Sequence, residues 1–379
     1  MARVWKGRFT TVLESGSGND EKRWGGNVVI DEGGCVMRTI ILALLFAVVG
    51  TPAFAQSEDS SFKATAVAIP GGKDGVGLDD IHFSPSLHKV LLPAGRTGKL
   101  YMIDPSSLAM TSVEGFSSST ENKKGQKVGI SSADEGEGFL FAADHGTHKL
   151  DAVDIKTGRI EASVPLAGDA DYVRYVEANH EVWVTEMNEA KRQIEVFAFT
   201  AGDKPGLSHV LDIPVAEGPE SLTIDHAHKR AYTNLGGQAA AIDVPTHAVI
   251  SQWPNGCEKP RGTAVDEQRG FLFVGCGEGQ AVVLDLNQNG KETGRLVTGA
   301  GADLVDYNPG LSHLYITGSK SATLSVLGVS PQGKLSLLGT GPAAERSHCV
   351  AGDDQNNIWV CDPNHGQLLR YKDTFPAVK

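Results

Sequence analysis

Short apolar runs alternate with turn-forming residues along most of this chain. Between Asp79 and Asp373 a polar residue, three apolar strands and the turns between them recur seven times. The opening strands are DDIHFSP from Asp79, VGISSAD from Val128, DYVRYVE from Asp171, ESLTIDH from Glu220, RGTAVDE from Arg261, DLVDYNP from Asp303 and HCVAGDD from His348. Repeats of roughly 40 to 50 residues with four strands each are typical of propeller blades. We therefore predict an all-β chain folded as a seven-bladed β-propeller.

The seventh repeat is one strand short, because the chain ends soon after Tyr371. A strand-like run, SFKATAVAIP at residues 61–70, stands unassigned before the first repeat. We expect this N-terminal strand to complete the last blade and to close the ring. Closure would remove an exposed sheet edge that could otherwise pair with other chains.

Three of the repeats resemble a known family pattern. The segments AYTNLGGQAAAID, FVGCGEGQAVVLD and LYITGSKSATLSVL each have a strand end, a turn with small residues and a following strand. They look like the YVTN repeat of exported, surface-layer-like seven-bladed propellers. The resemblance covers almost all of residues 79–373. It implies a fold and an exported protein, whereas the roles of such propellers vary.

An export signal is predicted near the start of the chain. Met37 and Arg38 are followed by an apolar run that ends in Ala53-Phe54-Ala55, as in a secretory signal with a small-residue cleavage site. We expect cleavage after Ala55, translation to start at Met37 with residues 1–36 an extension upstream, and residues 56–379 to form the propeller. The run is shorter than the roughly 20 residues of a membrane span, so we predict a periplasmic or secreted protein without a stable span once the signal is removed. A signal anchor is the alternative.

Four cysteines follow the predicted signal, and an even number in an exported protein favours disulfides. A turn centred on Gln355 would place Cys349 opposite Cys361 on neighbouring strands. A turn near Gln268 would bring Cys276 within reach of Cys257. We predict these two pairs; four reduced, buried cysteines are the alternative.

The net charge of the chain indicates which class of partner to expect. The chain has 34 Lys and Arg against 46 Asp and Glu, a formal net charge of -12. Nucleic-acid binding relies on positive charge, so we expect no nucleic-acid partner. A small molecule or a protein at the propeller face is the expected partner.

Candidate chemistry gathers where the channel of a propeller opens. First strands line the channel, and their starts share a face with the ends of second strands, so residues far apart in sequence converge there. The candidate ligand or metal residues at this mouth are Asp80, His145, Asp171, Glu186, Glu220, Asn234, Arg261, Asp303 and His348. Carboxylate and amide oxygens suit Ca²⁺, and histidine with carboxylates suits Zn²⁺ or acid–base catalysis. A purely structural role, in which these groups accept backbone hydrogen bonds, stays open, and no cofactor is certain.

Three functions of different kinds fit this sequence. The one we favour is an exported, non-catalytic binding or interaction module with its site at the channel mouth. The second is a metal-dependent lactonase or esterase, in which Glu220, Asn234 and Asp303 would hold the ion and His348 or His145 would carry the proton. The third is a propeller subunit of a periplasmic redox complex. No compact catalytic motif singles out an enzyme.

Overall fold

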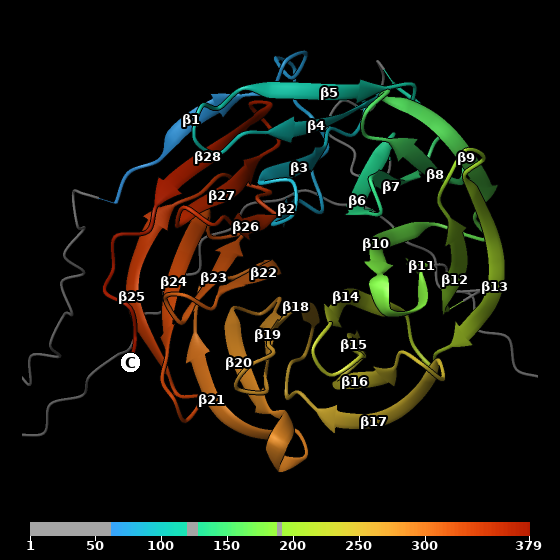
Figure 1. Cartoon of the computed structure of the whole chain (residues 1–379). Helices are drawn as coiled ribbons and strands as arrows, with labels where there is room; N and C mark the ends of the chain where they lie inside the picture. The colour runs from blue at the N-terminus through green and yellow to red at the C-terminus, as the bar shows by residue number, and fades with distance from the viewer. Residues whose placement is uncertain (1–61, 120–127, 188–191) are drawn as a thin grey trace, which may run out of the picture. The chain divides into compact units, whose positions relative to one another are not determined.

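Seven similar β-sheets stand around a common axis. The computed structural model describes residues 62–119, 128–187 and 192–379, within a compact unit from Ser57 to Lys379. Each of its seven sheets has four strands, and the inner strands β2, β6, β10, β14, β18, β22 and β26 surround the centre of the ring (Figure 1). The predicted all-β, seven-bladed propeller is confirmed.

Six blades are antiparallel meanders whose strands follow one another from the centre outwards. The first consists of β2 (His82–Ser84), β3 (Lys89–Pro93), β4 (Lys99–Ile103) and β5 (Met110–Glu114). The second consists of β6 (Ile130–Gly136), β7 (Phe139–Asp144), β8 (Lys149–Asp154) and β9 (Arg159–Pro165). The third consists of β10 (Ala170–Val176), the 3₁₀ helix η1 (Glu177–Asn179), β11 (Glu181–Glu186), β12 (Gln193–Thr200) and β13 (Gly206–Pro214).

The next three blades repeat this order. The fourth consists of β14 (Pro219–Asp225), β15 (Arg230–Leu235), β16 (Gln238–Asp243) and β17 (Ala248–Pro254). The fifth consists of β18 (Pro260–Asp266), β19 (Phe271–Cys276), β20 (Gln280–Asp285), the 3₁₀ helix η2 (Leu286–Gln288) and β21 (Lys291–Val297). The sixth consists of β22 (Ala302–Asn308), β23 (His313–Gly318), β24 (Thr323–Val329) and β25 (Leu335–Pro342).

The seventh blade joins the two ends of the propeller. Three of its strands come from the C-terminus, namely β26 (Val350–Gly352), β27 (Asn357–Asp362) and β28 (Gln367–Lys372). Its outer strand is β1 (Thr65–Ala68), which pairs antiparallel with β28. The predicted closure by the N-terminal strand is confirmed, and Val67 of β1 is buried against the blade.

The hydrophobic pattern of a strand follows its place in the blade. Second strands such as β7 are buried at every position, because both faces of the sheet are covered by neighbouring blades. Fourth strands such as β9 and β17 alternate between exposed and partly buried positions, since one of their faces meets solvent. The core therefore lies between blades. Two tryptophans, Trp183 and Trp359, are fully buried in it.

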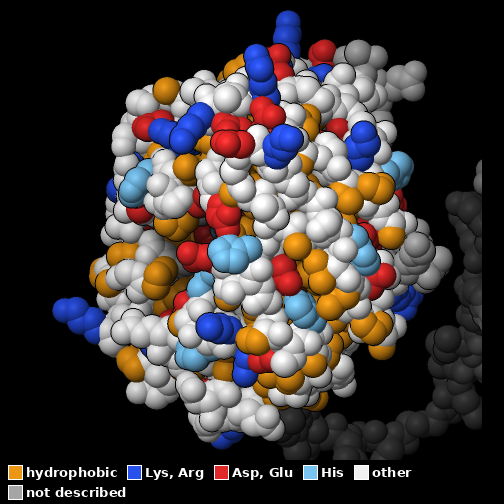
Figure 2. All heavy atoms as spheres, turned by 45° about the vertical axis from the view of Figure 1, so that its right-hand side comes forward, with side chains coloured by type: hydrophobic (Ala, Val, Ile, Leu, Met, Phe, Trp, Pro, Cys, Tyr) orange, Lys and Arg blue, Asp and Glu red, His pale blue; other side chains and the backbone are white. Residues whose placement is uncertain are grey.

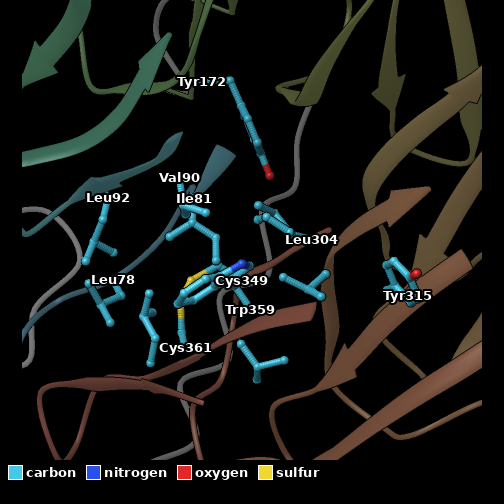
Figure 3. Packing of buried hydrophobic residues seen from close by; sticks show 14 of the residues in the cluster. Leu78, Ile81, Val90, Leu92, Tyr172, Leu304, Tyr315, Cys349, Trp359 and Cys361 are labelled. Atoms are coloured by element: carbon cyan, nitrogen blue, oxygen red, sulfur yellow. A yellow bond between two sulfur atoms is a disulfide. The ribbon is translucent and has the colours of Figure 1, made fainter. Parts of the chain in front are cut away.

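Both predicted cysteine pairs are disulfides in the structure. Cys257 pairs with Cys276, with their Cα atoms 5.3 Å apart, and Cys349 pairs with Cys361, with their Cα atoms 5.4 Å apart. The second pair links the inner strands of the seventh blade and packs in the same buried cluster as Trp359 (Figure 3). The prediction from turn positions holds because cross-strand partners are fixed by the centre of the hairpin.

The predicted signal, residues 37–55, and the upstream extension, residues 1–36, lie outside the described residues. Among the described residues, no helix has the length and the apolar character needed to cross a bilayer.

Candidate functional site

Charged side chains converge where the inner strands begin. We call this group the acidic mouth; it contains Asp79, Asp171, Glu220, Arg261, Asp303 and His348. The charges of its four carboxylates act on one another, although they come from four different blades. Ring closure thus produces a local negative field that no continuous stretch of sequence contains.

Two carboxylates of the acidic mouth have cationic partners within it. Arg261 forms an ion pair with Glu220. His348 Nδ1 lies 2.6 Å from Asp303 Oδ2, and both side chains are about one-fifth exposed. The arginine and the histidine therefore offset part of the negative charge of the acidic mouth, and His348 also acts on Asp79.

Burial and crowding of like charges raise the pKa values of Asp79 and Asp171. Burial, together with the carboxylates of Asp303, Asp80 and Glu220, raises the pKa of Asp79 to about 7 against the opposing effect of His348. Burial also raises the pKa of Asp171 well above its ordinary value, and among neighbouring charges Asp79 contributes most. Each carboxylate thus disfavours ionisation of the other, which is the electrostatic signature of a site that attracts protons or another cation.

Asp80, a predicted mouth residue, forms an ion pair with Arg174 of the third blade. Its side chain is buried and accepts hydrogen bonds from the two terminal guanidinium nitrogens of Arg174, at 2.6 and 3.1 Å, and from the hydroxyl of Ser132, at 2.6 Å. The residue that faces Asp303 and His348 is its neighbour Asp79. The first blade therefore contributes Asp79 to the acidic mouth.

Two of the predicted residues at second-strand ends, His145 and Asn234, contact neighbouring inner strands. His145 Nε2 lies 2.8 Å from the hydroxyl of Ser131. The amide of Asn234 donates to the carbonyl of Arg261, and its oxygen accepts from Asn255 at 3.1 Å. Glu186 is fully buried at the end of β11. The hydrogen bonds of His145 and Asn234 thus hold the inner strands β6 and β18 beside the acidic mouth.

The three residues of the lactonase hypothesis do not form a close set of ligands. Glu220 is paired with Arg261, Asp303 with His348, and Asn234 with backbone and amide groups. Among the described residues, two sets of three His, Cys, Asp or Glu side chains have ligand atoms within 4.8 Å of one another, and neither belongs to the acidic mouth. One of the two contains the disulfide-bonded Cys257 and Cys276.

Tyr172 and Arg174 are site residues that the sequence analysis missed. The Tyr172 side chain is buried in the channel with its hydroxyl directed toward Leu304 (Figure 3). Burial raises its pKa, and the carboxylates of Asp171 and Asp303 raise it further, so the phenol stays neutral and can donate a hydrogen bond. The Arg174 guanidinium lies 5.4 Å from the centre of the Tyr172 ring. The signal in the sequence was the spacing of Tyr172 and Arg174, which are two residues apart on the inner strand β10 and therefore share a face.

Beyond Tyr172 the channel widens into a cavity of about 1140 Å³. It opens among the turns between first and second strands, and Asp134, Glu135, Glu137, Glu177, Glu267 and Asp354 are among its lining residues. Of the described lining residues, Arg174 is the one Lys or Arg. In the space-filling view, acidic side chains and histidines gather around a hollowed part of the surface (Figure 2).

Comparisons with known proteins support the fold alone. No protein-family model matches the chain, and no curated protein is similar to it in sequence. A chain in the crystal structure of the mitotic checkpoint complex is similar, with a TM-score of 0.65 and 12% identity, over 89% of this chain and 100% of that one. A chain of Kuenenia stuttgartiensis hydrazine synthase is similar, with a TM-score of 0.64 and 12% identity, over 80% of this chain and 96% of that one.

Proposed function

We propose that this chain is an exported, YVTN-repeat-like propeller that works as a binding module, and that its acidic mouth binds a ligand with a cationic group. The observation that carries the proposal is the convergence of Asp79, Asp171, Glu220 and Asp303 on one opening. The signal-like segment before residue 56 and the two disulfides support export to the periplasm or beyond the cell.

The ligand is a small organic cation, such as a primary ammonium or guanidinium compound. Burial and neighbouring carboxylates raise the pKa of both Asp79 and Asp171, so a positive group placed beside them relieves repulsion. An organic cation also suits the distances between the mouth carboxylates better than a bare metal ion does. No three of the Asp, Glu and His side chains of the acidic mouth have ligand atoms within 4.8 Å of one another. The neutral phenol of Tyr172, beneath the carboxylates, supplies a hydrogen-bond donor to a polar tail.

Calorimetric titration tests the proposal. Residues 56–379 would be titrated with 1,5-diaminopentane, arginine methyl ester, CaCl₂ and ZnCl₂. We expect saturable binding of an organic cation that weakens at least tenfold in the double variant Asp79→Asn, Asp171→Asn. Binding should also tighten about tenfold from pH 6 to pH 8, because a carboxyl with a pKa of about 7 is largely protonated at the lower pH.

The matched control is Asp203→Asn, which removes an exposed carboxylate from the turn between β12 and β13. It changes net charge by one without touching the mouth, so its affinities should equal those of the wild type. If calcium or zinc binding disappears in the Asp79, Asp171 double variant, the ligand of the acidic mouth is a metal ion and not an organic cation. No loss of any binding in that variant would refute the acidic mouth as the site.

A further inference from the structure

Three metal-ligand side chains lie together on the outer part of the third blade, away from the channel. They are Glu195 on β12 and His209 and Asp212 on β13. Glu195 is directly opposite Asp212, and Phe197 is opposite His209. Val210 has no partner in this register, so β13 contains a bulge at that residue.

The bulge brings His209 and Asp212 to the same face of the sheet. Residues three apart in a regular strand point to opposite faces, because side chains alternate. One extra residue between them restores the same face. His209 Nε2 lies 2.7 Å from Asp212 Oδ1, and one ligand atom from each of the three residues lies within 4.8 Å of the others.

The surroundings hold two of the three ligands in position. Glu195 is buried, with 2% of its surface exposed, and accepts a hydrogen bond of 2.7 Å from the backbone N–H of Ala167. The His209 ring packs edge-on against Phe197, with ring centres 5.6 Å apart. The side chains of His209 and Asp212 are 44% and 43% exposed, so an ion can reach them from solvent.

Two carboxylates directly opposite each other on neighbouring strands repel, and a cation between them removes that repulsion. We propose that Glu195, His209 and Asp212 bind Zn²⁺, with water completing the coordination. One imidazole nitrogen and two carboxylate oxygens form a donor set that Zn²⁺ accepts, whereas Ca²⁺ takes oxygen ligands. The ion joins the two outer strands of the blade where the bulge interrupts their ladder.

Zinc titration of untagged, chelator-treated protein tests this site. We expect one Zn²⁺ per chain by calorimetry and a higher melting temperature with Zn²⁺ than with EDTA, because an ion that binds the folded state stabilises it. His209→Gln and Asp212→Asn should each weaken the affinity at least tenfold, while melting in EDTA stays near the wild-type value. Anomalous diffraction at the zinc edge should place the ion among the three side chains.

His228→Gln is the matched control. His228 is also exposed and also lies three residues from an aspartate, Asp225, but this pair belongs to neither set of three potential ligands among the described residues. Its zinc affinity should be unchanged, and so should that of the Asp79, Asp171 double variant, which separates this site from the acidic mouth. Absence of zinc binding, or equal affinity in wild type and His209→Gln, would overturn the proposal.

Discussion

At the scale of single residues, Asp79 connects function with stability. Its pKa in the folded chain is about 7, against 3.8 for an ordinary aspartate, because of burial and neighbouring carboxylates. The folded state therefore holds a proton that the unfolded state has lost between about pH 4 and pH 7. The free energy of unfolding must fall as pH rises through that range and then level off. A cationic ligand would restore the lost stability above pH 7.

Asp79→Asn should stabilise the ligand-free protein at pH 8, because the neutral amide removes the ionised carboxylate from the ring. We expect a gain of about 2 kcal/mol, below the full linkage value because the group is partly exposed, or a rise in melting temperature of about 4 °C. Melting curves from pH 4 to pH 8 would measure it, with the exposed Asp203→Asn as the control. A variant that melts at or below the wild-type temperature at pH 8 would show that Asp79 is not under electrostatic strain.

The repeat pattern led us to predict Asp171, Glu220, Arg261, Asp303 and His348 at one opening, because each lies at or just before the start of an inner strand. The first blade was different. Asp79 and Asp80 are consecutive and both precede β2 (His82–Ser84), so strand alternation does not fix which of the two faces the channel. A contact with another blade decides which aspartate faces the channel, because Arg174 of the third blade binds Asp80. Such a contact between blades cannot be recognised in the sequence around Asp79 and Asp80.

At the scale of elements, hairpin geometry explains why the cysteine pairs could be predicted and the zinc ligands could not. A regular hairpin fixes every cross-strand pair once its turn is known, and Cys349 and Cys361 continue the regular register of β26 and β27. Cys276 lies opposite Pro260, three residues from Cys257, although the register of that hairpin shifts between Pro260 and Thr263. The bulge at Val210 breaks this rule. Regular alternation would have placed His209 and Asp212 on opposite faces, so sequence analysis had no reason to group them with Glu195.

The Cys349–Cys361 disulfide should stabilise the seventh blade, whose inner strand β26 has three residues. The bond spans 12 residues, and the loss of unfolded-state entropy for such a loop corresponds to about 3 kcal/mol. Cys349→Ala with Cys361→Ala should therefore lower the melting temperature by about 6 °C. Differential scanning calorimetry would measure the change.

The Cys257→Ala, Cys276→Ala variant is the comparison. The disulfide that this variant lacks spans 19 residues, so chain entropy alone predicts a nearly equal decrease in melting temperature. A markedly larger decrease in melting temperature for the Cys349, Cys361 variant would mean that packing of this disulfide beside Trp359 stabilises the protein in addition to the entropic effect. No effect at either pair would contradict the view that these bonds stabilise the propeller.

At the scale of the whole molecule, the acidic mouth exists because the ring is closed. β1 supplies the fourth strand of the last blade, and its neighbour β28 would otherwise be an unpaired edge. Phe62, just before β1, stacks on Tyr371 with ring centres 4.8 Å apart, which adds an aromatic contact to the backbone pairing. The repeats made this architecture predictable, since each blade needs a neighbour on both sides to bury its faces.

A chain that begins at Gly71 should therefore melt at a lower temperature than one that begins at residue 57, and it should self-associate through the exposed edge of β28. A synthetic peptide of residues 61–70, added in trans, should restore the melting temperature and the monomer by supplying the missing strand. Calorimetry and size-exclusion chromatography with light scattering would follow both effects. The control is a chain that begins at residue 61, which keeps Phe62 and β1 and should behave as the longer chain does. If the Gly71 chain stays monomeric and melts unchanged, strand closure does not hold the ring together, and the convergence of Asp79 with Asp303 and His348 must depend on contacts between blades alone.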